Sequence, residues 1–291
     1  MFTRVVRLSS AQQVADVVAH RFMARITELL EGHDDVHVCL TGGGTADLVY
    51  ERFADLSAEA KLDLGRLHLW WGDERFVAAT DPDRNSLQAI SRLGRTLPIQ
   101  SARIHMMAAR DGRADPHDSA SEYAAELGET RFDVTFLGMG PDGHVASIFP
   151  GHPSFDSTSR SVIGVTDSPK PPSERISLTI PTLNRSDEVW FIVTGTGKAD
   201  ALIRTFDGDE SLPASHVHGQ QATYWFIDDA AASAQPQPPA HRKTSVRNSN
   251  KPLKTLFSCL PAAAIWNWIN SSKPRFLKTN GKKCAIISIK S

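Results

Sequence analysis

Short apolar runs alternate with stretches of helical spacing along most of the chain, and this alternation is the strongest constraint on the fold. Runs of four or five mostly apolar residues predict buried strands, whereas apolar residues at steps of three and four predict amphipathic helices. Their alternation favours a Rossmann-like α/β fold, a mainly parallel sheet covered by helices on both faces. The expected strands are residues 36–40, 67–71, 134–137, 176–180, 189–193 and 223–227, and the expected helices are residues 11–30, 46–56, 118–127 and 198–206.

Ligands of such sheets bind at the edge where the strands end, so the residues after each strand matter most. The strand at 36–40 runs into Thr41-Gly42-Gly43-Gly44-Thr45 and then into a helix. Glycines let the backbone approach an anion, and a helix start offers free N–H groups. Gly43, Gly44 and Thr45 are therefore candidates for binding a phosphate or an oxyanion; a turn without a ligand is the alternative. No Gly-Lys-Ser/Thr follows, so the loop is not a Walker A motif.

Charged residues follow the strand at 67–71 directly, in the sequence Trp71-Gly72-Asp73-Glu74-Arg75. Asp73 has the chemistry to bind sugar hydroxyl groups, and the Arg75 guanidinium can hold a phosphate or carboxylate with two parallel hydrogen bonds. A solvated turn explains the same residues without a ligand. The two side chains are nevertheless candidates for substrate binding.

The strand at 134–137 is followed by Gly138, Gly140 and Gly143, which match the G-x-G-x-x-G pattern of dinucleotide-binding loops. A nucleotide site is disfavoured because Asp142 would bring negative charge towards a pyrophosphate. No acidic residue ends a second strand about 20 positions later, as that fingerprint requires. We interpret the segment as a glycine-rich elbow that presents His144 as a general base. Asp142, two residues away, either orients that histidine or binds substrate.

Two cations lie beside later strands. Arg175 begins the strand at 176–180, and Lys198 follows a glycine turn at the start of a helix. Two positive charges together with helix N–H groups would hold a phosphate dianion well. Taken singly, each is better explained as an unpaired surface charge.

Together these motifs resemble the 6-phosphogluconolactonase family, within the superfamily of the glucosamine- and galactosamine-6-phosphate isomerases. The matching segments, in family order, are TGGGT at 41–45, WWGDERFV at 70–77 with Asn85-Ser86 downstream, LGMGPDGHVASIFPGHP at 137–153, PPSERISLTIPTLN at 171–184 and TGTGKADAL at 194–202. The resemblance implies a fold related to the sugar-phosphate isomerases and metal-free hydrolysis of 6-phospho-D-glucono-1,5-lactone in the pentose phosphate pathway. It also implies that His144 is the base and that Arg75, Arg175 and Lys198 contact the phosphate or the sugar.

A δ-lactone is a reactive ester, so hydrolysis needs a positioned water, a base and an oxyanion site rather than a covalent nucleophile. No G-x-S-x-G elbow is present. A glucosamine-6-phosphate deaminase is the alternative enzyme, since those relatives share Asp-Gly-His. They carry a nearby acidic residue, however, and here no acid follows His144 before Asp156. A sugar-phosphate-binding module without catalysis is the third possibility.

The charge of the chain changes sharply near its C-terminus. Residues 232–291 carry 11 Lys and Arg side chains and no acidic residue, so all 33 Asp and Glu side chains precede them. We therefore expect one α/β domain at 1–231 and a basic tail at 232–291 that is disordered or not native to the family. Such a tail has the charge to bind nucleic acid or anionic membranes. We expect neither partner, because no helical or strand period organises its basic residues.

The remaining features concern compartment and cofactors. Three distant cysteines favour a reducing compartment over a disulfide framework. The N-terminus has no apolar signal region, and no apolar stretch is long enough to span a membrane. His216-x-His218 is the only close histidine pair late in the domain, and a solvated loop explains it better than a metal. We expect a cytoplasmic monomer without cofactor or metal whose partner is a small phosphorylated sugar lactone.

Overall fold

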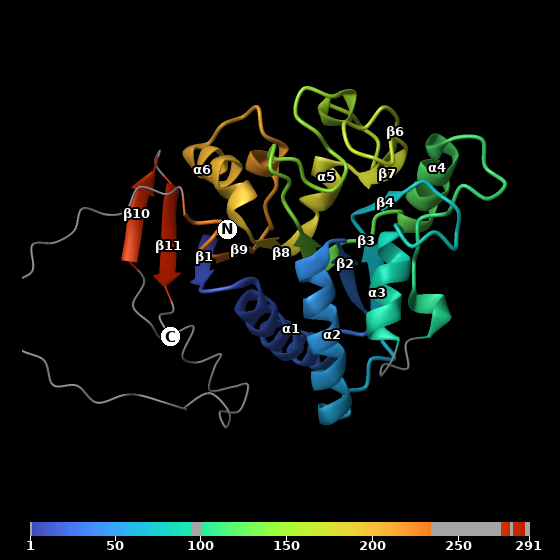
Figure 1. Cartoon of the computed structure of the whole chain (residues 1–291). Coiled ribbons are helices and arrows are strands. Elements are labelled where there is room, and N and C mark those ends of the chain that lie inside the picture. Colours follow the sequence, from blue (N-terminus) through green and yellow to red (C-terminus); the bar gives the residue numbers. More distant parts are fainter. Residues whose placement is uncertain (1, 95–99, 234–274, 280–281, 289–291) are drawn as a thin grey trace, which may run out of the picture.

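The computed structural model describes residues 2–94, 100–233, 275–279 and 282–288. Its main sheet has a parallel part with the strand order β1-β9-β8-β5-β2-β3 (Figure 1). These strands are β1 (Phe2–Leu8), β2 (Val36–Leu40), β3 (Leu67–Trp71), β5 (Phe132–Leu137), β8 (Ser186–Val193) and β9 (Ala222–Asp228). Because all six run in the same direction, their carboxyl ends share one edge.

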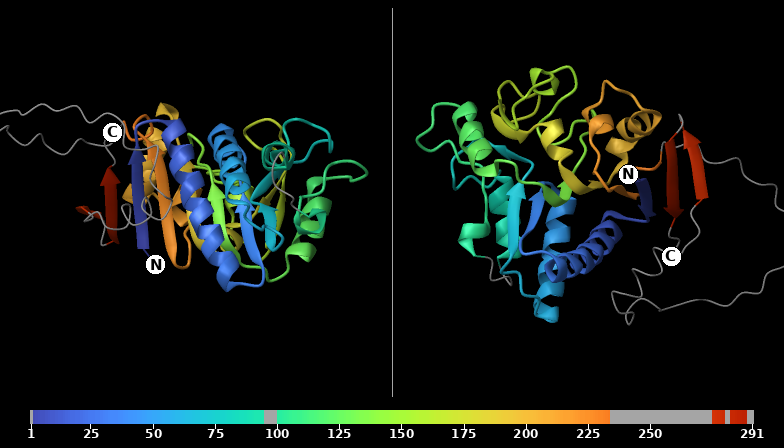
Figure 2. Two further views of the ribbon diagram at one scale, coloured as in Figure 1. Left: turned by 90° about the horizontal axis from the view of Figure 1, so that it is seen from below. Right: turned by 180° about the vertical axis from the view of Figure 1, so that it is seen from behind.

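Helices cover both faces of this sheet, as the alternation of strands and helices predicts. On one face α1 (Ala11–Gly32) and α2 (Gly44–Ala60) pack on the strands, and on the other face α4 (Pro116–Leu127) and α6 (Ala199–Asp207) do so (Figure 2). The remaining helices are α3 (Asn85–Leu93), which lies against α2, and the short α5 (Ile180–Leu183). Within the described residues, no helix has the length and apolar character to cross a membrane.

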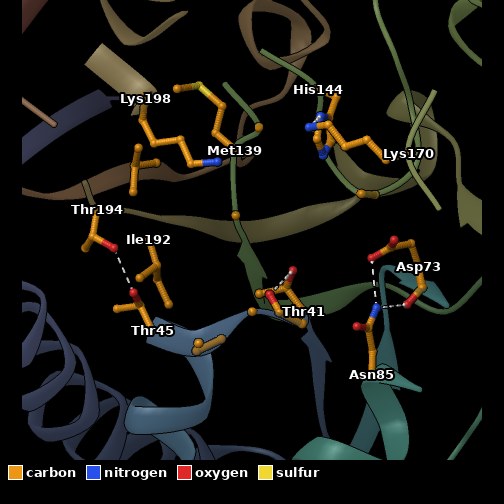
Figure 3. Close-up of a pocket in the computed structure, with 18 of the residues that line it drawn as sticks. Thr41, Thr45, Asp73, Asn85, Met139, His144, Lys170, Ile192, Thr194 and Lys198 are labelled. Atoms are coloured by element: carbon orange, nitrogen blue, oxygen red, sulfur yellow. Dashed lines mark hydrogen bonds between the residues drawn. The ribbon is translucent and has the colours of Figure 1, made fainter. Parts of the chain in front are cut away.

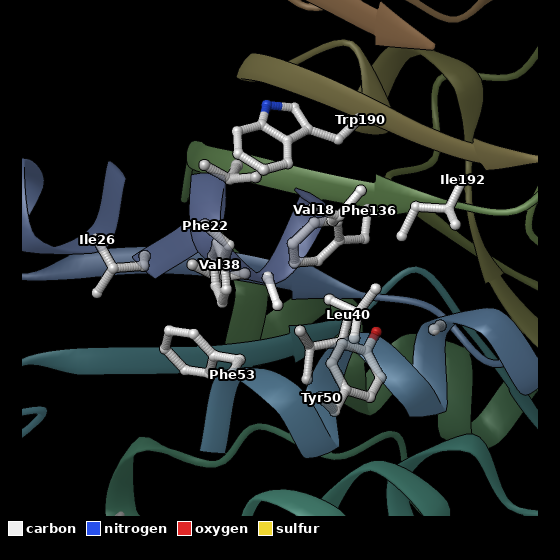
Figure 4. Close-up of a cluster of buried hydrophobic side chains, with 14 of the residues drawn as sticks. Val18, Phe22, Ile26, Val38, Leu40, Tyr50, Phe53, Phe136, Trp190 and Ile192 are labelled. Atoms are coloured by element: carbon white, nitrogen blue, oxygen red, sulfur yellow. The ribbon is translucent and has the colours of Figure 1, made fainter. Parts of the chain in front are cut away.

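Aromatic side chains from four elements pack together in the core beneath α1 (Figure 4). Phe22 of α1 packs 4.5 Å from Phe53 of α2 and 4.8 Å from Phe136 of β5, between ring centroids. Trp190 of β8 closes the cluster and is fully buried. Burying each such side chain contributes about 1.5–3 kcal/mol, so this cluster fixes α1 on the sheet. The helix begins after Ser10, whose hydroxyl accepts a hydrogen bond from the Gln13 N–H.

The strand expected at 176–180 does not belong to the parallel sheet. Residues 175–178 form β7, which pairs antiparallel with β4 (Asp73–Arg75) and β6 (Val162–Val165) in a second, three-stranded sheet. Residues 180–183 turn into α5 instead. An apolar run marks burial but not the partner strand, and here two short strands that we did not predict supply the partners. The small sheet carries Arg175 to the carboxyl edge of the main sheet.

Of the basic tail, the structure describes only β10 (Arg275–Thr279) and β11 (Lys282–Ser288). β11 pairs parallel with β1, and β10 pairs antiparallel with β11, so the two strands extend the main sheet beyond β1. For these residues regular structure replaces the disorder expected from composition, because Ala285-Ile286-Ile287 is a β-favouring run. The rest of the tail lies outside the described residues, and the domain boundary stays a prediction.

Candidate active site

A cavity of about 460 Å³ opens at the carboxyl edge of the parallel strands, within the size range of small-molecule sites (Figure 3). Loops from β2, β3, β5 and β8 meet there with the loop that precedes β7. All but one of the residues predicted from sequence line the cavity: Gly43, Gly44, Thr45, Asp73, Arg75, His144, Arg175 and Lys198. The exception is Asp142, which contacts His144.

The centre of the site is the pair formed by His144 and Asp142. Nδ1 of His144 lies 2.6 Å from Oδ1 of Asp142, a short charge-assisted hydrogen bond. When Nδ1–H donates to the carboxylate, Nε2 carries the lone pair and is free to accept a proton. Burial alone would raise the pKa of Asp142, but the hydrogen bond from His144 and the charges of His144 and Lys170 hold that pKa well below its ordinary value. Asp142 is therefore an anion that orients the imidazole.

The glycine spacing that resembles a dinucleotide loop serves this pair instead. A Cβ on Gly140 would lie 2.0 Å from Nδ1 of His144 and 2.4 Å from Oδ1 of Asp142, so only glycine leaves room for both. Gly143 adopts a φ of 82°, in the left-handed region, and its N–H donates to the Gly140 carbonyl. The tight turn thereby returns His144 over Gly140.

Lys170 is a site residue that the sequence reasoning missed. Its Nζ lies 3.1 Å from Nδ1 of His144 and 3.5 Å from Oδ1 of Asp142. It comes from the loop between β6 and β7, 26 positions from His144. The sequence analysis used the motif that begins at Pro171, directly after this lysine, and did not single out the lysine itself.

Arg175 lines the cavity, as expected, but its hydrogen bonds in the structure are to the protein itself. Its guanidinium donates to the carbonyls of Lys170 (3.2 Å), Pro171 (2.9 Å) and Pro172 (3.1 Å), and it lies 4.0 Å from the Asp73 carboxylate. The side chain is only 8% exposed. Burial lowers the pKa of Arg175, and the Asp73 charge opposes that shift. Arg175 lines the cavity, but most of its hydrogen bonds hold the Lys170 loop.

Asp73 likewise faces the cavity with a carboxylate that already has protein partners. Oδ2 accepts a hydrogen bond from the Ser147 hydroxyl at 2.7 Å, and Oδ1 lies 3.3 Å from Nδ2 of Asn85. Ser147 is fully buried and is not among the residues that line the cavity. Arg75 also lines the cavity and donates to the Asp83 carbonyl.

The opposite side of the cavity is built for an anion. α2 begins at Gly44 after Gly43, whose φ of 117° requires a glycine, and its first N–H groups belong to the loop that lines the cavity. Thr45 and Thr194 touch through their hydroxyl oxygens at 2.7 Å, which ties the start of α2 to the loop after β8 (Figure 3). Lys198 belongs to that loop.

The Lys198 ammonium has no hydrogen-bond acceptor among the residues that the structure describes. Burial lowers its pKa, and the positive charge of Lys170 lowers it further. An anion placed between the two lysines and the helix start would relieve both effects. The cavity thus joins a histidine–aspartate pair on one side to a cationic region around Lys198 on the other.

Comparisons with known proteins agree with this arrangement. The family model described as glucosamine-6-phosphate isomerases/6-phosphogluconolactonase matches residues 9–225. A 6-phosphogluconolactonase of Streptomyces coelicolor is 40% identical over 244 residues, covering 78% of this chain and 94% of the relative. The corresponding enzyme of Mycobacterium tuberculosis is 39% identical over 229 residues, or 74% of this chain and 92% of that one.

Solved structures give the same picture. A 6-phosphogluconolactonase from Thermotoga maritima superposes with a TM-score of 0.68 at 31% identity, covering 78% of this chain and 99% of that one. A monomeric glucosamine-6-phosphate deaminase reaches the same TM-score at 21% identity, over 79% and 99% of the two chains, a likeness of fold alone.

Proposed function

This chain belongs to the glucosamine-6-phosphate isomerase and 6-phosphogluconolactonase family, and we propose that it hydrolyses 6-phospho-D-glucono-1,5-lactone to 6-phosphogluconate in the cavity described above. The curated relatives at 30–40% identity are 6-phosphogluconolactonases, and lactone hydrolysis is a step of the pentose phosphate pathway. The observation that carries the proposal is the juxtaposition of the His144–Asp142 pair with the cationic region of Lys198 in one cavity.

In the first step, Nε2 of His144 takes a proton from a water molecule as that water attacks the lactone carbonyl carbon. The negative charge of Asp142, bonded to Nδ1–H, stabilises the imidazolium that forms. The carbonyl oxygen becomes an oxyanion, which hydrogen-bond donors of the cavity stabilise.

In the second step, the bond between the carbonyl carbon and the ring oxygen breaks. His144 returns its proton to the departing ring oxygen, which becomes the hydroxyl group of 6-phosphogluconate. The water oxygen remains on the carbonyl carbon, so no covalent enzyme intermediate is needed. Ser147 takes no part, because its hydroxyl donates to Asp73.

The phosphate is assigned to the side of the cavity where Lys198 and the start of α2 meet. The Thr45–Thr194 contact holds these two elements together. Binding the phosphate there fixes the substrate through a group remote from the reacting carbon, which places the carbonyl near His144. Arg75 lines the same cavity and is assigned to a polar group of the sugar or its phosphate.

Two further features belong to the proposal. The described residues contain no group of three or more His, Cys, Asp or Glu placed to hold a metal ion, and the His144–Asp142 pair supplies the base that a metal-bound water would otherwise provide. A monomeric enzyme is part of the proposal. A cytoplasmic location is also part of the proposal. It is supported by the buried Cys39, a free thiol of the kind expected in a reducing compartment.

One assay separates the candidate activities. The purified protein is given the phosphorylated lactone, with the spontaneous rate subtracted, and separately glucosamine 6-phosphate with detection of ammonia. We expect lactone hydrolysis and no ammonia. Ammonia release would identify a deaminase, and binding of 6-phosphogluconate without turnover would identify a non-catalytic module.

A further inference from the structure

Glu74 is a fully buried carboxylate that takes no part in the chemistry described above. It lies in β4, and its oxygens accept hydrogen bonds from three backbone N–H groups. Oε1 accepts from Arg75 (2.9 Å) and Asn85 (2.7 Å), and Oε2 accepts from Ser86 (2.9 Å). A carboxylate at a helix start is favoured by the free N–H groups and by the helix dipole. Glu74 therefore fixes where α3 begins.

The first residue of α3 is Asn85, whose side chain reaches the cavity. Its Nδ2 donates to the Asp73 carbonyl at 2.9 Å, which sets the direction of the amide. Oδ1 then points away from Asp73 and towards the side of the cavity where Thr41 lies (Figure 3). A Cβ on Gly42 would lie 2.0 Å from Oδ1, so a glycine is required opposite this atom.

Oδ1 of Asn85 is buried and has no hydrogen-bond partner among the described residues. The whole residue is only 2% exposed. A buried acceptor left without a donor is costly, which indicates that a ligand supplies the donor when the cavity is filled. The Asp73 carboxylate beside it is already paired with Ser147 and Asn85. Asn85 Oδ1 therefore differs from the Asp73 oxygens in this corner of the cavity, because it has no donor among the described residues.

We propose that Asn85 binds a ring hydroxyl group of the sugar through Oδ1 and that Glu74 is the positioning residue that holds it there. The inference rests on the proposed function, since that function brings a polyhydroxylated substrate into the cavity. A hydroxyl hydrogen is the donor that suits a neutral amide oxygen. The proposal adds Asn85 to Asp73, which the sequence suggested, as a residue that contacts the sugar hydroxyl groups.

The test is a double-mutant cycle with Asn85→Ala and Glu74→Gln, read as kcat/KM on the phosphorylated lactone. Gln keeps the shape of Glu74 but replaces one acceptor oxygen by a donor that faces backbone N–H. We expect each single variant to lose about tenfold or more, chiefly through KM for Asn85→Ala. The double variant should match Asn85→Ala within about threefold, because Glu74 acts through Asn85. Losses that multiply in the double variant would contradict the positioning role.

Glu188→Gln is the matched control. Glu188 is also a buried carboxylate, but it lies in β8 away from the cavity, bonded to Trp190 and Arg25. We expect kcat/KM within about twofold of wild type even where its melting temperature falls. An equal loss of kcat/KM in this variant would mean that losing any buried carboxylate lowers activity, and the role of Glu74 would be rejected.

A second measurement decides the case if Glu74→Gln yields no folded protein. Wild type and Asn85→Ala are compared on phosphorylated lactones in which each ring hydroxyl group is replaced in turn by hydrogen. For one of these substrates the two proteins should have equal kcat/KM, because the hydroxyl partner of Oδ1 is gone. A constant ratio for all of them would overturn the inference. A wild type without lactone turnover would refute the proposed function itself, which keeps the two failures distinct.

Discussion

The imidazole of His144 lies against the Cα atom of Gly140, so that a Cβ on Gly140 would be 2.0 Å from Nδ1. No side chain can occupy that space unless the histidine moves. The first prediction follows: Gly140→Ala should lower kcat by about tenfold or more, since a misplaced base loses most of its advantage. Binding of 6-phosphogluconate should change little. The control is Gly32→Ala, at the end of α1, where a methyl group meets open space and kcat should be unchanged. Normal kcat in Gly140→Ala would mean that His144 need not stay in this position.

The second prediction concerns Lys198. Lys198→Ala should chiefly raise KM, because phosphate contacts are made in the ground state and the transition state alike. Burial lowers the pKa of Lys198 from its ordinary value of 10.5, and the ammonium form binds the anion. Wild-type KM should therefore rise as the pH passes the pKa of Lys198, which lies below 10.5. The Lys198→Ala variant should lack that rise. The unphosphorylated lactone should be a poor substrate. If it reacts as well as the phosphorylated one, the phosphate assignment is wrong.

The third prediction is that activity needs no metal. Incubation with a chelator, followed by removal of the chelator–metal complex, should leave kcat/KM unchanged. The reason is that the His144–Asp142 pair supplies the base. A loss that zinc or magnesium restores would contradict the proposed mechanism.

Much of the fold could be predicted from the sequence because burial leaves a local signature. The runs at 36–40 and 67–71 are β2 and β3 to the residue, since each is short, apolar and closed by a turn. β1 was missed because polar side chains interrupt its apolar residues. The antiparallel pairing of β7 with β4 and β6 was missed because pairing depends on partners that are distant in sequence.

The candidate site, like the fold, could be predicted from the sequence only in part. His144 and Asp142 were predicted because they share one loop with the glycines that make room for them. Lys170 was not, since its contact with His144 spans 26 positions and two separate loops. Arg175 was found, but its hydrogen bonds to carbonyls of the Lys170 loop could be seen only in three dimensions.

The fourth prediction is that the tail is dispensable for chemistry. Ala231 and Ala232 are buried in the core, so a truncated chain should end after Ser233 rather than at Ala231. We expect its kcat/KM within about threefold of the full chain, because the cavity residues all precede that point. Loss of β11 exposes the edge of β1, so a modest fall in melting temperature is expected. A tenfold loss of kcat/KM in soluble truncated protein would show that the tail supports the site.

The central claim, that His144 is the general base of lactone hydrolysis, is tested most directly by kcat of His144→Ala. The rate is measured on the phosphorylated lactone with spontaneous hydrolysis subtracted, and binding of 6-phosphogluconate confirms that the cavity is intact. Loss of a general base should lower kcat by about 10²–10⁴-fold with binding nearly unchanged. A variant that keeps more than about half of the wild-type kcat would remove His144 from that role.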